Sequence, residues 1–167
     1  MVLSAAELVN LLQHEVKILV FLAGKATGAA RDYRPSPKQR STTELLRYLS
    51  MMGPALMTVA RTGVFDGAAW SAEERAAADL TFDEAVGAIA AQSGAYAAQA
   101  GELTAEYLRA EVTPFGEPMS RGRFIVQYVL CGYAAYRTQL FLYLKVSGHP
   151  ELGTTELWDG VDPPAKG

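Results

Sequence analysis

The sequence predicts an all-α protein, a four-helix bundle whose helices are joined by long crossing loops. The composition favours helix, because the chain has 27 Ala and 19 Leu but only 3 Ile, and Ala and Leu lose little rotamer freedom in a helix. Four long segments also repeat apolar residues at the spacing of an amphipathic helix. Burying four such stripes against one another requires a bundle.

The first predicted helix runs from about Ala5 to Ala23. Its apolar positions define the face that should be buried: Leu8, Leu11, Leu12, Glu15/Val16, Leu19 and Leu22. The opposite face is polar and carries His14, which we expect to be solvated and not a ligand. Residues 24–40, which follow, contain Pro35 and Pro37 and predict an ordered connector or an extended arm.

Two capping boxes mark the starts of the second and third helices. They are Ser41-Thr42-Thr43-Glu44 and Thr81-Phe82-Asp83-Glu84, in which the hydroxyl and the carboxylate can each accept a hydrogen bond from a free backbone N–H. The core stripe of the second helix is Leu45, Leu49, Met52, Leu56 and Val59. Gly53-Pro54 should kink this helix near its middle. The stripe of the third helix is mostly small, which allows close approach, and consists of Phe82, Ala85/Val86, Ile89, Ser93, Tyr96 and Ala100.

The last and longest helix is predicted from about Ser120 to Ser147, with Gly148 in the position of a left-handed cap. Before it, the helical period fails between 101 and 121, and residues 111–119 predict an irregular loop or a small hairpin. The bundle should occupy residues 1–150. Residues 151–167 should form a C-terminal tail that packs on the bundle, with Trp158 against it.

Charge and composition argue against several classes of protein. The net charge of −3 provides no basic footprint for phosphates, so we expect no nucleic-acid partner. The longest charge-free stretch, 85–101, includes Gln and Ser, so no membrane span is expected. The N-terminus lacks the plan of a signal peptide. The single cysteine, Cys131, forms no intrachain disulfide, and a cytoplasmic location fits these features.

Residues with polar tips follow one side of the last helix. On a helical wheel Gly132, Tyr136, Gln139 and Tyr143 fall within about 60° of one another. They either line a pocket or belong to aromatic core packing with Tyr hydroxyls that reach the surface. Tyr48, at the edge of the second helix's stripe, should point into the bundle or a cavity mouth. Cys131 is expected to be a buried, inert thiol.

Two motifs resemble the DinB-like (DinB/YfiT) superfamily of four-helix metalloproteins. One is the connector Arg34-Pro35-Ser36-Pro37 with the helix start Ser41-Thr42-Thr43-Glu44-Leu45-Leu46-Arg47-Tyr48-Leu49, similar to the family's stretch ending in Leu-x-His-Leu. The other is Tyr136-Arg137-Thr138-Gln139-Leu140-Phe141-Leu142-Tyr143-Leu144-Lys145, similar to the family's His-x-x-x-His-Arg-Gly-Gln and its continuation. With helix order and length, the resemblance covers most of residues 5–150.

The resemblance implies a divalent metal held by three histidines and a thiol-dependent transferase or isomerase activity. Carried over by position, the ligands here would be Tyr48, Gly132 and Tyr136. Glycine has no side chain and a neutral tyrosine is a poor donor, and the chain has only two histidines. We therefore expect no metal or other cofactor. Arg137 and Gln139 occupy the family's Arg and Gln positions and should hydrogen-bond across helices.

Three functions stay open on this basis. The leading hypothesis is a metal-free DinB-like module that binds a small ligand or another protein. Its candidate pocket residues are Tyr48, Gly132, Tyr136, Arg137, Gln139 and Tyr143. The alternative is a thiol-dependent transferase or isomerase that uses an unrecognised metal site or the Tyr-lined cleft, where a tyrosine pKa should lie well below about 10. The third is a structural role as a homodimer.

Overall fold

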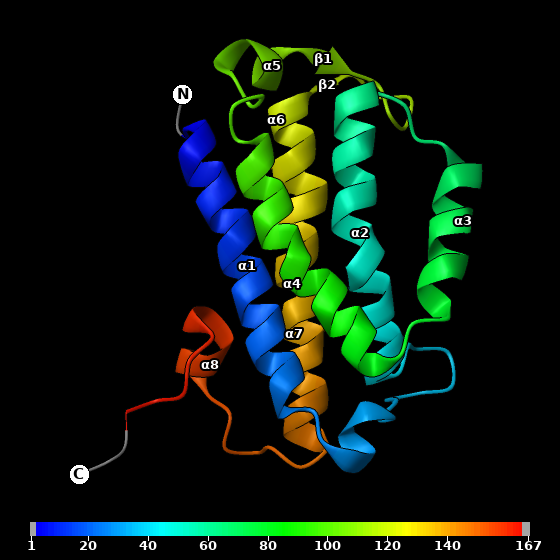
Figure 1. Ribbon diagram of the computed structural model, residues 1–167, viewed down its shortest axis with the longest axis vertical. Helices are drawn as coiled ribbons and strands as arrows, with labels where there is room; N and C mark the ends of the chain where they lie inside the picture. The colour runs from blue at the N-terminus through cyan, green and yellow to red at the C-terminus, as the bar shows by residue number, and fades with distance from the viewer. Residues whose placement is uncertain (1–2, 165–167) are drawn as a thin grey trace.

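Four long helices form a bundle in the computed structural model, which describes residues 3–164 (Figure 1). The first three are α1 (Ala5–Lys25), α2 (Thr42–Thr62) and α4 (Phe82–Gln99). The last combines α6 (Arg121–Phe124), a π-helical turn (Ile125–Leu130) and α7 (Cys131–Val146). The predicted all-α four-helix fold is confirmed, but the last helix is not the regular α-helix that was expected.

The helices follow the order α1, α4, α2, α7 around the bundle, since α1 and α2 each contact both α4 and α7. α1 and α7 run in one direction, and α2 and α4 run in the other (Figure 1). The chain therefore passes diagonally from α1 to α2 and again from α4 to α7, which needs the long crossing connections that the sequence predicts. The first of these contains the 3-10 turn η1 (Gly28–Arg31).

A shorter helix, α3 (Gly67–Ala78), lies outside the bundle against α2. It returns the chain to the end at which α4 begins, so that α2 and α4 can run parallel (Figure 1). The sequence did not predict α3, because only Ala77 in it is buried and it has no apolar stripe. The Asp66 carboxylate caps it by accepting hydrogen bonds from the N–H groups of Ala68 and Ala69.

The end of the bundle between α4 and α6 is covered by α5 (Ala105–Arg109) and a two-stranded hairpin. β1 (Glu111–Val112) pairs antiparallel with β2 (Met119–Ser120), with Val112 opposite Met119. Of the two structures predicted for residues 111–119, an irregular loop or a small hairpin, the hairpin is confirmed. The five-residue α5 is too short to show a period in the sequence.

Local signals place the helix starts. The Ser41 hydroxyl accepts from the Glu44 N–H at 3.3 Å, while the Glu44 carboxylate accepts from the Ser41 N–H at 2.8 Å. Thr81 and Glu84 repeat this exchange at the start of α4, so both predicted capping boxes are confirmed.

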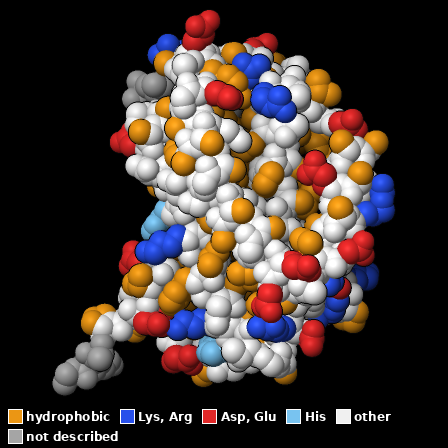
Figure 2. Space-filling model, in the orientation of Figure 1, with side chains coloured by type: hydrophobic (Ala, Val, Ile, Leu, Met, Phe, Trp, Pro, Cys, Tyr) orange, Lys and Arg blue, Asp and Glu red, His pale blue; other side chains and the backbone are white. Residues whose placement is uncertain are grey.

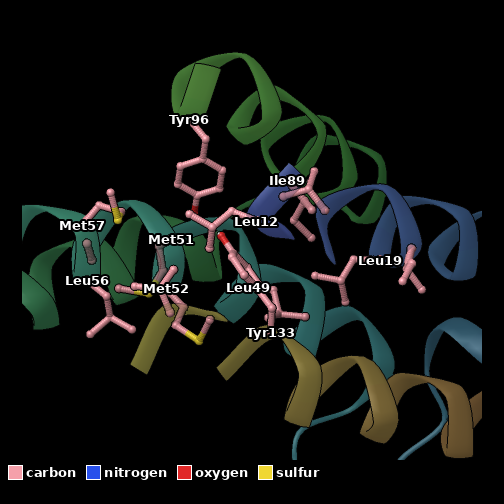
Figure 3. Close-up of a cluster of buried hydrophobic side chains, with 14 of the residues drawn as sticks. Leu12, Leu19, Leu49, Met51, Met52, Leu56, Met57, Ile89, Tyr96 and Tyr133 are labelled. Atoms are coloured by element: carbon pink, nitrogen blue, oxygen red, sulfur yellow. The ribbon is translucent and has the colours of Figure 1, made fainter. Parts of the chain in front are cut away.

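The predicted core stripes of α1 and α2 are buried except at Leu11, which is 39% exposed. Figure 3 shows the centre of this core, where α1, α2, α4 and α7 meet. The hydroxyls of Tyr96 on α4 and Tyr133 on α7 point toward each other there and lie 2.5 Å apart. Two polar groups at the middle of an apolar core must be hydrogen-bonded, and this pair is.

A buried amide completes this polar pair and explains how α2 passes through Pro54. Pro54 has no N–H to donate to the Ser50 carbonyl one turn earlier. The Gln92 side-chain amide donates to that carbonyl at 2.9 Å and to the Leu49 carbonyl at 3.1 Å, while the Gln92 oxygen accepts from Tyr133. α2 therefore continues as one α-helix across Gly53-Pro54. The sequence placed Gln92 outside the core stripe of the third helix.

The chain after α7 folds back on α1 through a short helix, α8 (Thr154–Asp159). His14 Nε2 lies 2.8 Å from the Trp158 carbonyl, and Lys17 donates to the Asp159 carbonyl at 2.9 Å, so His14 is bonded and not simply solvated. The Trp158 side chain is 57% exposed. The expectation that Trp158 packs on the bundle is only partly met, because the ring covers Arg137 but remains largely in water.

No helix within residues 3–164 combines the length and the apolar character that crossing a bilayer requires. On the face shown in Figure 2, acidic and basic side chains are interspersed, and neither kind forms a continuous patch.

Candidate functional site

An open groove lies between α2 and α7, bordered by the start of α3, the hairpin loop and the π-helical turn. Its volume is about 470 Å³, which is within the range of pockets for small molecules. Three of the six predicted pocket residues line it: Tyr48 from α2, with Gly132 and Tyr136 from α7. The pattern on the last helix therefore identified the location of the groove, and α2 supplies the facing side.

Six aromatic side chains line this groove and form what we call the aromatic wall. They are Tyr48, Phe65, Trp70, Phe115, Tyr128 and Tyr136. Neighbouring rings along the wall have centroids 5.2–6.2 Å apart, in edge-to-face or tilted contacts. This is the geometry that aromatic pairs prefer. The wall thus joins α7, α2, α3 and the hairpin loop into one continuous surface.

Gly132 keeps space open between α2 and α7. A Cβ atom at this position would lie 3.3 Å from Cε and 3.5 Å from Sδ of Met52, which also lines the groove. Any longer side chain would occupy the groove itself. The glycine that the sequence placed in the polar ribbon is therefore part of the groove's floor.

Among the groups that line the groove, the Tyr48 hydroxyl has the most strongly shifted pKa. Tyr48 is half-buried, with the Arg40 guanidinium 4.0 Å from its ring centroid and the Tyr136 ring at 5.2 Å. Burial raises the pKa of Tyr48 above its ordinary value of 10.0, and the adjacent Tyr136 hydroxyl raises it further. Tyr48 therefore stays protonated, which is opposite to the lowered tyrosine pKa expected of a Tyr-activated transferase.

The prediction that Cys131 is buried is wrong. Cys131 is exposed and lines the groove. It begins the exposed outer face of α7, which continues through Ala135 and Thr138, and Ala135 also lines the groove. Apolar spacing along a single helix does not indicate which of its apolar faces remains uncovered.

Gln139 and Tyr143 lie on the same side of α7 but beyond the groove. Tyr143 is buried, accepts from the Gln139 amide and donates to the Arg40 carbonyl at 3.1 Å. Its ring contacts Tyr33 edge-to-face at 5.5 Å. These two residues hold the connector between α1 and α2 onto α7. Gln139 bonds within its own helix, so the expectation that it bonds across helices is wrong.

Arg137 faces away from the groove, toward α1. Its guanidinium lies 3.0 Å from the Glu15 carboxylate, and its Cζ is 5.1 Å from the Trp158 ring centroid. Arg137 and Glu15 are 4% and 8% exposed, so this is a buried ion pair. The expected bond across helices is confirmed for Arg137, but it is not a groove residue.

Four members of the aromatic wall were not predicted as groove residues from the sequence: Phe65, Trp70, Phe115 and Tyr128. Phe65 and Phe115 belong to connecting segments, and Trp70 belongs to the unpredicted α3. For these three the signal was the presence of large aromatic residues in segments with no helical period, which a solvated loop does not need. Tyr128 lies four residues before Gly132 in the predicted last helix, so helical spacing could have placed it beside the polar ribbon.

No family model matches the sequence, and none of the curated proteins matches it. Its structure is similar to the crystal structure of a DinB-like protein, YjoA, from Bacillus subtilis, with a TM-score of 0.67 and 20% sequence identity. The match covers 88% of this chain and 95% of that one. The chain has a DinB-like fold. At this level of identity the similarity concerns the fold alone.

The DinB-like resemblance implied a metal at Tyr48, Gly132 and Tyr136, and the groove permits a test of that fit. The three positions do lie together, but they contribute two phenols and no third side chain. The raised pKa of Tyr48 makes it a still poorer donor. Among residues 3–164 no group of three His, Cys, Asp or Glu side chains is placed to hold a metal ion. The residues at these three positions therefore do not fit a divalent metal.

Proposed function

We propose that this protein binds a small organic molecule in the groove between α2 and α7 and does so without a metal. The observation that carries the proposal is the aromatic wall, six rings around about 470 Å³ at the place where the resemblance put a metal. Pockets for small molecules are largely apolar with a few polar groups. Here the polar groups belong to Tyr48, Tyr128, Tyr136, Gln127 and Cys131.

The groove is suited to binding because its walls are preorganised. The rings hold one another in place through contacts between four separate segments. A ligand therefore has to order few side chains on entering, which reduces the entropic loss on binding. The neutral Tyr48 hydroxyl can donate or accept one hydrogen bond.

A thermal-shift screen tests the proposal, with neutral aromatic compounds, low-molecular-weight thiols and divalent metals as separate sets. A ligand at 100 times its Kd should stabilise the protein by about 2.7 kcal/mol, or by about 5–10 °C for a chain of this size. We expect a shift with at least one aromatic compound such as 1-naphthol. A flat response to every aromatic compound would contradict the proposal.

Gly132→Leu should abolish that shift, because the side chain would fill the space beside Met52. Gly94→Leu is the matched control, since it makes the same change at an exposed position of α4 where no atom lies within 4 Å of the Cβ position. It should bind as the unaltered protein does. Elemental analysis completes the test, because one tightly bound zinc or nickel ion per chain would contradict binding without a metal.

The homodimer stays a prediction, and one observation favours it. Beyond the groove, the outer face of α7 is uncharged at Thr138, Leu142 and Val146, and the last two are 54% and 69% exposed. Two copies paired through this face would oppose no like charges. Light scattering should give twice the 18.0 kDa chain mass. Leu142→Glu should give the monomer, and a monomeric unaltered protein would refute the pairing.

A further inference from the structure

A second hollow adjoins the groove and differs from it in charge. It shares Phe65 and Trp70 with the groove, has a volume of about 300 Å³ and lies between α2 and α3. Two carboxylates, Asp66 and Glu73, line it. Among its lining residues, all within the described part of the chain, none is Lys or Arg.

The groove itself contains no ionised side chain among the described residues that line it. The Arg40 guanidinium lies beside the groove, over the Tyr48 ring, but it is paired with the Glu74 carboxylate at 3.3 Å. An anionic ligand would therefore have to compete with Glu74 for the cation at this edge. A cation would find the faces of aromatic rings, whose negative quadrupoles attract positive charge. The Tyr48 ring already holds a cation in this way, because the Arg40 guanidinium lies 4.0 Å from its centroid. The charge of a ligand would therefore face the rings at the other end of the wall, Trp70 and Phe65.

We propose that the groove and the adjoining hollow select an organic cation of the alkylammonium class. The apolar substituents would lie against the aromatic wall, and the charge would face the rings of Trp70 and Phe65 on the side where Asp66 and Glu73 approach. This inference rests on the proposed binding function and adds the charge of the ligand to it. The volumes of the two hollows, about 300 and 470 Å³, leave room for a cation with a body of about one aromatic ring.

Three phenols of closely similar shape but different charge test the inference. (3-Hydroxyphenyl)trimethylammonium is a cation, 3-tert-butylphenol is its neutral isostere, and 3-hydroxybenzenesulfonate is an anion. Binding can be followed by calorimetry and by the fluorescence of Trp70 in a Trp158→Phe background, since the chain has two tryptophans. We expect the ammonium compound to bind about three- to thirty-fold more tightly than the neutral isostere, and the sulfonate to bind least.

Glu73→Gln separates charge from packing, because Glu73 is exposed and the change keeps its size. It should weaken the ammonium compound about two- to five-fold by removing a nearby charge and leave 3-tert-butylphenol unchanged. Glu106→Gln, on α5, is the control and should alter neither. Circular dichroism confirms that each variant is folded.

The outcomes distinguish this inference from the function on which it rests. Equal binding of the ammonium compound and its isostere, or tightest binding of the sulfonate, would overturn the cation while leaving a ligand-binding groove. Failure of all three compounds to bind, together with a flat response to 1-naphthol, would overturn both. A preference for the ammonium compound that survives Glu73→Gln unchanged would overturn the role of the adjoining hollow.

Discussion

Replacement of Gly53 by Ala is expected to lower the free energy of unfolding by about 2–5 kcal/mol. A Cβ atom at this position would overlap the Tyr133 and Tyr96 hydroxyls, which are buried at the centre of the core. Neither ring can move aside without breaking their shared hydrogen bond or the bond from Tyr133 to Gln92. Urea unfolding, followed by circular dichroism, measures the change.

Gly94→Ala is the matched control for this substitution. Gly94 is also within a helix, but no atom lies within 4 Å of the position its Cβ would take. There Ala should stabilise the protein by up to about 1 kcal/mol, because it is the better helix former. If Gly53→Ala also stabilises, or changes the free energy by less than 0.5 kcal/mol, the buried polar cluster is not packed as described.

The second large effect is expected at the buried ion pair of Glu15 and Arg137. Arg137→Met should destabilise the protein by about 3–5 kcal/mol, because it leaves a buried carboxylate without its partner. The double variant Glu15→Leu/Arg137→Met should recover most of this loss, since an apolar pair of similar volume can replace a buried ion pair. If the double variant is less stable than Arg137→Met, the loss is one of packing and not of charge.

The pH dependence of unfolding provides an independent check of the same pair. Burial raises the pKa of Glu15 above 4.5, although Arg137 and His14 act in the opposite direction. Between pH 4.5 and the folded pKa, the Glu15 carboxyl is therefore protonated in the folded state and ionised in the unfolded state. The resulting stabilisation is complete below pH 4.5 and is lost as the pH rises through the higher folded pKa. Glu15→Gln should remove this loss, and Arg137→Met should extend it to higher pH.

The bundle could be predicted from the sequence because its signals are local. Apolar spacing identified α1, α2, α4 and the last helix, and the Ser41 and Thr81 capping boxes placed two helix starts correctly. α3 could not be found in this way. It is held to α2 by Trp70 and Ala77 and otherwise lies in solvent, so its residues show no period.

The groove could be predicted only in part, since a helical wheel describes one helix at a time. It grouped Gly132 and Tyr136 correctly, but it also included Tyr143, which lies about two turns farther along the axis and contacts the connector. The exposure of Cys131 depends on which side of α7 has no neighbour, which is a property of the assembled bundle. The contact between Phe65 and Phe115 is also a property of the assembled bundle, because their ring centroids are 5.3 Å apart although the residues are 50 positions apart in the sequence.

Because of the π-helical turn at Ile125–Leu130, the groove depends on the number of residues in this turn as well as on the side chains that line it. A π-helical turn contains one residue more than an α-helical turn, and each residue of an α-helix turns the chain by about 100°. Deleting one residue there would restore regular geometry and rotate α7 relative to α6 by that angle. Gly132 and Tyr136 would then turn away from Tyr48. A relative that lacks this single residue should therefore have a different groove, even if every aromatic side chain were retained.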